Sequence, residues 1–474
     1  MKNIGGIGQV LIITTVFIIS RIIAFSFGLH LDIRALSSYW QYLDLYTLKN
    51  NLLVGAWYDH SQPPIFNLFL GLILKIGGSH STLIFACLLK IISLTNAILL
   101  FIITKKIVQI KFIPFFITLI YILSPATLVF ENELFYTTFI SLLLLISVFN
   151  LVRLVESGNR LNVFGVVVSL TLLCMTRSIY HIFWLFLIIL TILFYFRKKP
   201  FINTLVAVSV TGIIVVGSWY IKNKIIFGKF TNSTWLGMNM ARNVFHDNNA
   251  KDSSLIEAYE PFSKISVYRK FIDPQFENRY RGLNDLDLLK EMKNDSFINL
   301  TEVSYIPVSD LYLKASEGFI SKHPGVYAKN VLQSSILYFT PATIYSLAFE
   351  QTSKIKTYDL LYSFNLTHFS NNKLQRRVLL TISALPKLAI YLFVFFCLIR
   401  ICLRTGSITI WNLFIMLTII YVFGISSFFE HYENMRFRFE TEPIFLILAA
   451  QALGFLFFRI GKPDKTMNGD MLVV

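Results

Sequence analysis

Long apolar stretches separated by polar connections dominate this sequence of 474 residues, 55% of which are hydrophobic. A helix needs about 20 apolar residues to cross the hydrocarbon core of a bilayer. Ten stretches approach that length, at roughly residues 7–29, 82–103, 113–130, 134–152, 161–177, 179–196, 201–219, 378–401, 408–428 and 441–460. Because a soluble domain could not bury so much apolar surface, we expect an all-α polytopic membrane protein with about ten transmembrane helices, in a range of 10–12.

The formal net charge of +16 indicates how the chain is oriented in the membrane. Basic residues in short loops face the cytoplasm, and no basic patch here has the pattern of a nucleic-acid-binding module. The basic clusters fall on alternate connections: Lys105, Lys106 and Lys111; Arg153 and Arg160; Arg197, Lys198 and Lys199; Arg400 and Arg404; Arg459 and Lys462. This alternation predicts two cytoplasmic termini. We expect a bacterial plasma (inner) membrane rather than an endoplasmic reticulum.

Two predicted external connections are too long to be simple turns. The first, residues 30–81, contains an amphipathic pattern over 35–53 and a short apolar stretch, 65–78, typical of an interfacial helix. The second is expected to form a small external subdomain with interfacial helices, with residues 331–349 lying on the outer surface. The predicted division is an N-terminal transmembrane module (1–220), the external subdomain (221–377), and C-terminal transmembrane helices with a cytoplasmic tail (378–474).

Charged residues in and near the first connection are candidates for chemistry. Asp32 directly follows the first span, where a carboxylate can act as a general base on an acceptor hydroxyl. Arg34 can pair with Asp32 or bind a phosphate through its planar guanidinium. Arg21 lies inside the apolar span, where a charge is costly and usually functional. The plainer interpretation of Asp32 is a polar helix end, and that of Arg21 is a side chain reaching the membrane surface.

The run from His60 to Pro64 predicts a rigid turn that enters the short helix 65–78, whose N-terminus would attract phosphate. His60 is more often a buried polar residue than a ligand, and the four cysteines lack metal-ligand spacing. We therefore expect no required cofactor, although a divalent metal at His60 stays open. Other candidates on predicted external turns are Asp44, Gln62, Glu131, Glu133, Arg177, His181, Glu433, Arg436 and Arg438.

These residues lie in motifs that resemble the GT-C class of polytopic glycosyltransferases. The chain is similar to the group that contains protein O-mannosyltransferases, lipid A aminoarabinose transferase and RgtA/B/C/D-like bacterial enzymes. The matching motifs, in chain order, are Asp32, Gln62-Pro63-Pro64, Asn132-Glu133, Trp219-Tyr220-Ile221-Lys222-Asn223 with Phe227-Gly228, His323-Pro324, and Glu433-Asn434-Met435-Arg436-Phe437-Arg438 followed by Glu442-Pro443.

The resemblance implies a GT-C-like fold and an inverting transfer of sugar from a polyprenyl-phosphate donor to an acceptor hydroxyl on the external or lumenal face. It implies Asp32 as the base. Arg21, Arg34, Gln62, Arg177, Arg436 and Arg438 are the candidates for binding the donor phosphate or lipid. Asp44, His60, Glu131, Glu133, His181 and Glu433 are the candidates for binding substrate. Ile33 and Gln62 depart from the pattern, because relatives often carry Glu and Lys or His there, and the main phosphate ligand stays open.

Two other functions remain consistent with the sequence. A polymerase or ligase for lipid-linked oligosaccharide also has many spans and a large external loop, but would depend on arginines rather than on an aspartate base. A lipid flippase or transporter would move substrate without forming a glycosidic bond, and tends to place ionisable groups at mid-membrane. The implied partners are a lipid-linked sugar donor, membrane lipid, and a glycan, lipid or protein acceptor, with no nucleic acid.

Overall fold

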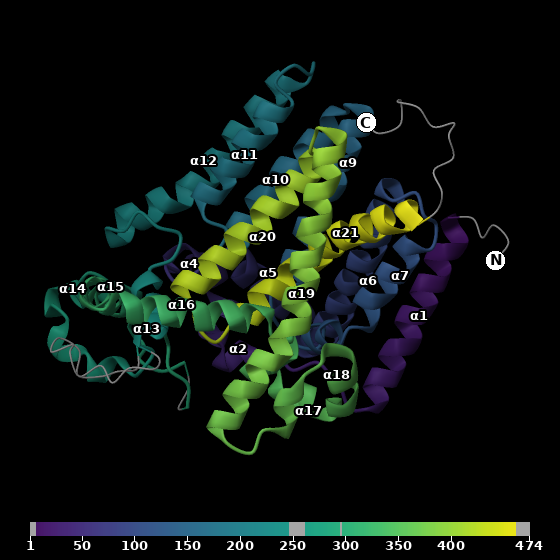
Figure 1. The fold of residues 1–474 in the computed structure, drawn as a ribbon. Helices are drawn as coiled ribbons and strands as arrows, with labels where there is room; N and C mark the ends of the chain where they lie inside the picture. The colour runs from purple at the N-terminus through teal and green to yellow at the C-terminus, as the bar shows by residue number, and fades with distance from the viewer. Residues whose placement is uncertain (1–5, 246–260, 294–295, 461–474) are drawn as a thin grey trace.

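A computed structural model describes residues 6–245, 261–293 and 296–460 of the chain, so the predicted cytoplasmic tail after residue 460 lies outside the described residues. In these ranges the chain is helical, and extended pairing is limited to two isolated bridges. Seven helical segments are long and apolar enough to cross a membrane. They are α1 (Gly6–Ser26), α5 with α6 (Ile65–Gly77 and Ser81–Ile107), α9 (Thr137–Ser157), α12 (Ile202–Phe227), α19 (Lys373–Thr405), α20 (Ile410–Phe429) and α21 (Asn434–Ile460) (Figure 1). The protein is therefore an all-α, multi-pass membrane protein, as predicted.

Three shorter apolar helices fall on the remaining predicted spans: α7 (Ile113–Leu123), α10 (Arg160–Thr176) and α11 (Ile182–Tyr195). Helix α7 stops because Ser124 adopts an extended conformation ahead of Pro125, and the chain restarts as α8 (Pro125–Phe130). Every predicted span thus coincides with a helix, but three helices are too short to cross a bilayer unaided. Seven segments are long enough to cross, and the count of about ten crossings, in a range of 10–12, stays a prediction.

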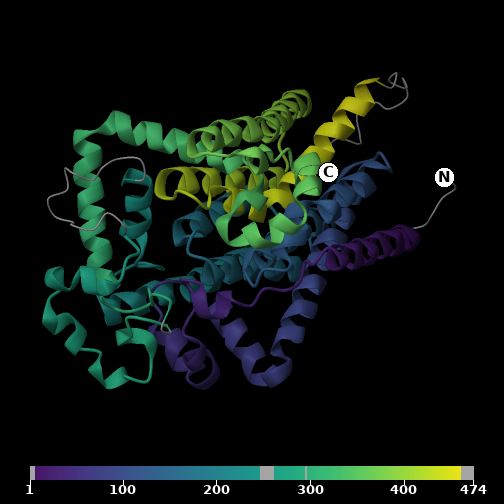
Figure 2. The ribbon, with the colours of Figure 1, turned by 90° about the horizontal axis from the view of Figure 1, so that it is seen from below.

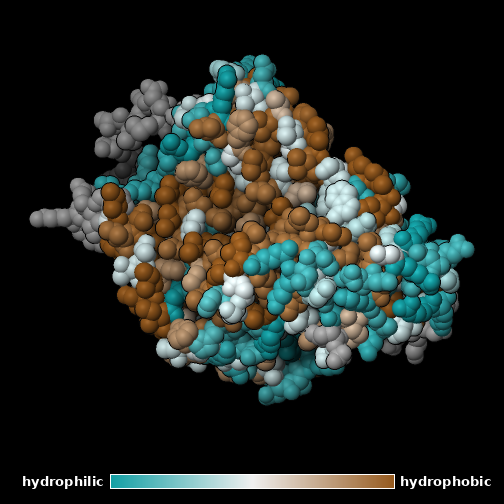
Figure 3. Space-filling model, turned by 180° about the vertical axis from the view of Figure 1, so that it is seen from behind, coloured by the Kyte–Doolittle hydropathy of each residue, from teal (hydrophilic) through white to brown (hydrophobic). Residues whose placement is uncertain are grey.

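Helices α9 and α21 occupy the centre of the bundle, whereas α1 lies at its edge. The apolar window of α9 and of α21 is 61% buried, against 22% for α1. The outward faces expose large apolar side chains, among them Ile18, Ile22, Phe183, Phe186, Ile214, Leu392 and Phe396. Figure 3 shows a broad hydrophobic surface bordered by hydrophilic regions. A bilayer solvates such a surface, whereas water does not.

The first connection folds into short helices, so the single helix predicted over residues 35–53 is wrong. The structure has α2 (Ala35–Ser38), α3 (Leu45–Asn50) and α4 (Leu52–Tyr58). The Asp44 carboxylate caps α3 by accepting hydrogen bonds from the amides of Tyr46 (2.8 Å) and Thr47 (3.4 Å). A capping residue is itself non-helical, and this one interrupts the apolar periodicity. Residues 65–77 form α5, which meets α6 at a sharp turn around Gly78, whose φ is +49°. Figure 2 shows α5 and α6 as the two arms of a V.

The second long connection contains its own hydrophobic core, separate from that of the bundle. Helix α13 (Leu236–Phe245) packs closely on α15 (Tyr305–Lys322), because a Cβ at Gly237 would stand only 1.8 Å from the Ser309 carbonyl oxygen. The region also contains α14 (Pro274–Asn278), α16 (Pro324–Phe339), α17 (Phe349–Lys354), α18 (Lys356–Ser363) and several short 3-10 helices.

The stretch 331–349, predicted to lie on the outer surface, covers the second half of α16 and the turn after it. Helix α16 is 16 residues long and is not one of the seven segments fit to span. It packs against α19, α20 and α21, and ends before Pro341, which has no amide hydrogen to continue a helix. The stretch therefore docks on the bundle, at a large angle to α19 (Figure 1).

Candidate active site at one end of the bundle

Four connections far apart in the sequence meet at one end of the bundle, here called the site end. They are residues 30–64, 131–136, 177–181 and 430–433. The Asp32 amide donates a hydrogen bond to the Asn132 carbonyl (2.7 Å). The Ser178 amide donates to the Gln62 side chain (3.3 Å), and Arg177 forms an ion pair with Glu440 near the start of α21. The predicted site residues on these connections thus share one end of the molecule.

Asp32 and Glu133 lie next to each other because their backbones pair in an isolated parallel bridge. The Asp32 carboxylate accepts hydrogen bonds from the Arg34 amide (2.8 Å) and from Arg34 Nε (2.8 Å). Arg34 also contacts Glu350 at 2.5 Å. Burial alone would raise the pKa of Asp32, but the hydrogen bonds and charge of Arg34 lower it below its usual value. Asp32 is therefore ionised at neutral pH.

Glu133 has the opposite protonation state. It is 3% exposed, and its Oε1 has no hydrogen-bond partner within the described residues. Burial, reinforced by the negative charge of Asp32, raises the pKa of Glu133 to about 9. Two neighbouring carboxyl groups whose environments push their pKa values apart can divide the roles of base and hydrogen-bond donor. Asp32 is the group able to accept a proton, and Glu133 the group able to donate one.

The first turns of α21 carry charged residues on two faces. Glu433, Arg436 and Glu440 follow the spacing i, i+3 and i+7, so they lie along one side, whereas Arg438 and Glu442 lie along another. Arg436 pairs with Glu433, and Arg438 pairs with Glu442. Arg436, Arg438 and Glu440 are at most 2% exposed. A buried charge at the end of a helix bundle is expensive and usually serves binding or catalysis.

Arg436 lies in a box of aromatic rings. The rings of Tyr39, Phe135, Tyr136, Tyr345 and Phe437 all lie within 5.1–5.9 Å of its guanidinium carbon. Its Nη2 donates to the Tyr136 hydroxyl (3.3 Å). In the part of the chain that the structure describes, its Nε and Nη1 have no hydrogen-bond partner although the side chain is fully buried. Two unsatisfied buried donors on a cation are what a phosphate oxygen would satisfy.

The Arg177 guanidinium lies close to the same aromatic box. It stacks on the rings of Phe437 (4.1 Å) and Tyr136 (5.0 Å) and is 3% exposed. Its carboxylate partner, Glu440, is fully buried. Arg177 therefore joins the turn between α10 and α11 to α21 and keeps a second cation near Arg436.

On the other face of α21, a cavity of about 130 Å³ opens between α7, α18, α19 and α21. Its walls are largely apolar and include Tyr362, Phe364 and Pro386. Its charged lining is a cluster formed by Lys387, Arg438 and Glu442, in which Lys387 Nζ lies 2.7 Å from a Glu442 carboxylate oxygen. Apolar walls with a few convergent charged groups are the lining expected of a ligand site, but this volume is below the roughly 300–1,000 Å³ of most small-molecule sites.

Arg21 and Glu131 face each other inside the bundle. Arg21 Nε and Nη2 donate to the Glu131 carboxylate at 2.9 and 2.7 Å, and Nη1 donates to the Ile122 carbonyl at 2.8 Å. Both side chains are nearly inaccessible. A phosphate or substrate could reach either one only by displacing its partner.

The other predicted residues hold the local structure. His60 is fully buried between the Thr234 hydroxyl (2.7 Å) and the Thr301 carbonyl (2.9 Å), and burial lowers its pKa to about 3. Both ring nitrogens of His60 are thus engaged. Asp44 caps α3, and the His181 ring caps α11 by accepting from the Phe183 amide (3.2 Å). Among the described residues, no group of three histidine, cysteine or acidic side chains could hold a metal ion.

Several residues of the site were missed by the sequence analysis. Lys387 is the clearest, because it lies inside an apolar stretch, and the rule that singled out Arg21 applies to it as well. The tyrosines of the aromatic box, Tyr39, Tyr136 and Tyr345, gave no such signal, because aromatic residues are common near membrane surfaces.

Comparisons with protein-family models, with curated proteins and with solved structures gave no significant match to this chain.

Proposed function

We propose that this protein is an integral-membrane glycosyltransferase. It moves a sugar from a polyprenyl-phosphate donor to an acceptor hydroxyl on a glycan, lipid or protein at the external face. The observation that carries the proposal is the Asp32–Glu133 pair, an ionised and a neutral carboxyl group placed side by side at the end of the bundle where buried arginines gather.

Asp32 is the proposed base. It lies outside the apolar helices, so a hydroxyl from the aqueous side can approach it, and its side chain retains 11% exposure. A positioned base of this kind contributes roughly 100- to 10,000-fold to a reaction rate. Arg34 orients the Asp32 carboxylate through two hydrogen bonds. Neutral Glu133 is placed to donate a hydrogen bond to the sugar or to the acceptor without repelling a phosphate.

The donor phosphate is proposed to bind on α21. Two sites on opposite faces of the helix are alternatives for this phosphate. Arg436 offers two unsatisfied hydrogen-bond donors on one face, and on the other face the Lys387–Arg438–Glu442 cluster borders a cavity whose apolar walls suit part of a lipid chain. The leaving group of the reaction is a lipid phosphate, which gains negative charge as the bond to the sugar breaks. Fixed cations in a dry site stabilise that charge.

In the proposed reaction the acceptor hydroxyl gives its proton to Asp32 as its oxygen attacks the anomeric carbon. The bond between that carbon and the phosphate oxygen breaks from the opposite side, so the configuration inverts. The bonding electrons leave with the phosphate, which departs as polyprenyl phosphate. No metal step is needed in this scheme, because arginine and lysine side chains carry the countercharge.

The experiment is mass spectrometry of glycolipids and glycoproteins from cells that lack the protein, complemented with wild type or with Asp32→Asn. Glu350→Gln is the matched control, because Glu350 pairs with the same Arg34 but is 58% exposed. We expect wild type and Glu350→Gln to restore a species one sugar heavier, and Asp32→Asn to fail. Equal restoration by Asp32→Asn would contradict the proposal and favour a polymerase or a transporter.

A further inference from the structure

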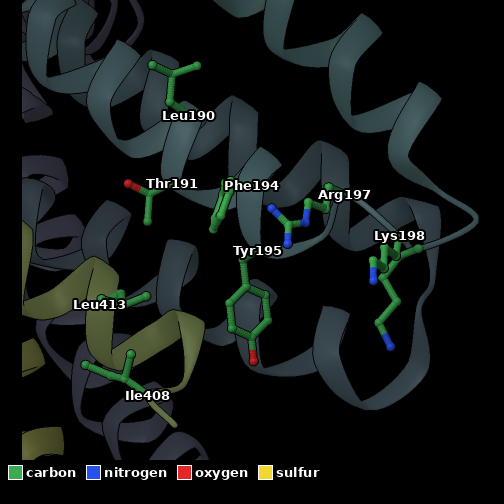
Figure 4. A pocket seen from close by; sticks show the side chains of 9 residues that line it. Leu190, Thr191, Phe194, Tyr195, Arg197, Lys198, Ile408 and Leu413 are labelled. Atoms are coloured by element: carbon green, nitrogen blue, oxygen red, sulfur yellow. The ribbon is translucent and has the colours of Figure 1, made fainter.

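A second, larger cavity lies at the end of the bundle opposite the site end. It measures about 660 Å³ and opens between the end of α11 and the start of α20. Its apolar walls are formed by Leu190, Phe194, Ile408 and Leu413. Figure 4 shows Phe194 beside Arg197 on one wall, with Leu413 and Ile408 across the cavity. This volume is within the range of small-molecule sites, about 300–1,000 Å³.

Three consecutive cations, Arg197, Lys198 and Lys199, border this cavity, and no acidic residue lines it. The guanidinium carbon of Arg197 lies 4.2 Å from the centroid of the Phe194 ring, and this contact holds the cation against the apolar wall. All three side chains are exposed, and within the described ranges none of them forms an ion pair.

Three neighbouring basic residues at the same end have polar partners. Lys106 and Arg153 both pair with Glu156, at 2.8 and 3.5 Å, and Lys105 donates to Gln9 at 3.0 Å. At the cavity, by contrast, three consecutive cations that form no ion pair within the described residues border an apolar space.

We propose that this cavity binds an anionic phospholipid of the inner leaflet. The lipid phosphate lies at Arg197, Lys198 and Lys199, and the acyl chains run along Leu190, Phe194 and Leu413. Charge complementarity selects the headgroup, because basic pockets between helices on the cytoplasmic side attract anionic lipid. The apolar walls select a lipid over a free anion. The site is independent of the chemistry proposed for the site end.

The test is native mass spectrometry of the purified full-length protein in detergent with mixed phosphatidylglycerol and phosphatidylcholine of identical chains. The variant is Arg197→Gln/Lys198→Gln/Lys199→Gln. The control, Lys105→Gln/Lys111→Gln/Arg160→Gln, removes the same charge from the same end of the bundle. We expect wild type and control to retain phosphatidylglycerol preferentially, and the cavity variant to lose that retention about tenfold or more.

A second variant, Leu413→Trp, narrows the cavity at the wall where the acyl chains are proposed to lie, without removing a charge. This variant should also reduce retention of phosphatidylglycerol. In a separate competition with the wild-type protein, inorganic phosphate that supplies the same concentration of negative charge as the lipid should not displace it. Thermal unfolding of each variant, followed in the same detergent, checks that the fold is kept. Undiminished retention by the triple cavity variant, or equal losses in that variant and its control, would overturn the proposal.

Discussion

Asp32 and Glu133 are held together by their backbones: the Asp32 amide donates to the Asn132 carbonyl, and the Leu134 amide donates to the Asp32 carbonyl at 3.3 Å. The pairing of their side chains therefore does not depend on a hydrogen bond between the carboxyl groups. Either carboxyl group can be replaced while the two segments stay joined, which makes the pair suitable for mutagenesis.

The first prediction concerns the pH dependence of activity. Because burial raises the pKa of Glu133 to about 9, its neutral form persists through neutral pH and is lost near pH 9. If the neutral form is required, the rate should fall as pH rises through about 9. Glu133→Gln stays neutral at every pH, so it should keep activity and lose this alkaline limb. A Glu133→Gln enzyme that keeps the limb would show that another group titrates there.

Glu133 should also influence stability in the same pH window. Between its usual pKa of 4.5 and about 9, the folded protein holds a proton that the unfolded chain has released. Stability should therefore decrease as pH rises across this window. Thermal unfolding in detergent at several pH values should show a weaker pH dependence for Glu133→Gln than for wild type.

The second prediction concerns Arg436. Arg436→Lys keeps the charge but removes the planar set of donors, including the two that lack partners. Hydrogen bonds to charged groups contribute about 1.5–3 kcal/mol. The affinity for the lipid-phosphate sugar should therefore fall roughly 10- to 100-fold. The measurement is KM for the lipid-phosphate sugar. Arg400→Lys, at the opposite end of the bundle, is the control and should leave KM unchanged.

The third prediction concerns the cavity beside α21. Lys387→Met is similar in length but uncharged, and it leaves Arg438 and Glu442 paired with each other. If the cavity binds the lipid phosphate, Lys387→Met should weaken donor binding with little change in the rate at saturating donor. A lowered rate at saturation with unchanged donor binding would instead place Lys387 near the reacting atoms.

The fourth prediction concerns the buried Arg21–Glu131 pair. Arg21→Met leaves Glu131 without its cation and should cost about 3–5 kcal/mol of stability. Arg21→Met/Glu131→Leu removes both charges and should recover much of that loss. Thermal unfolding of the single and double variants measures the coupling. Additive losses in the double variant would contradict a direct stabilising pair.

The helices could be predicted from the sequence because apolar length is a local property of the chain. Asp32 and Glu133 could be chosen as candidates because each follows an apolar stretch. The partners of charged residues could not be predicted, because they depend on which helices become neighbours. Lys387 and Glu442 belong to different helices, and nothing in the sequence pairs them.

The first connection shows a second limit of the sequence. The apolar periodicity of residues 35–53 predicted one helix, but the Asp44 cap divides the segment. A cap is recognised from a single side chain, whereas periodicity averages over many residues. The two signals conflict here, and the capping hydrogen bonds prevail over the averaged pattern.

The separation of Arg21 from Glu131 by 110 residues also sets an order of events during synthesis. Chains grow at about 5–20 residues per second, so Arg21 leaves the ribosome roughly 5–20 s before its carboxylate partner. Until then, the first helix contains an uncompensated cation and is costly to release into lipid. The helix should therefore stay beside the insertion machinery, or near the bilayer surface, until the turn after α8 has been made. The formation of this ion pair should therefore determine when the first helix is released into the lipid.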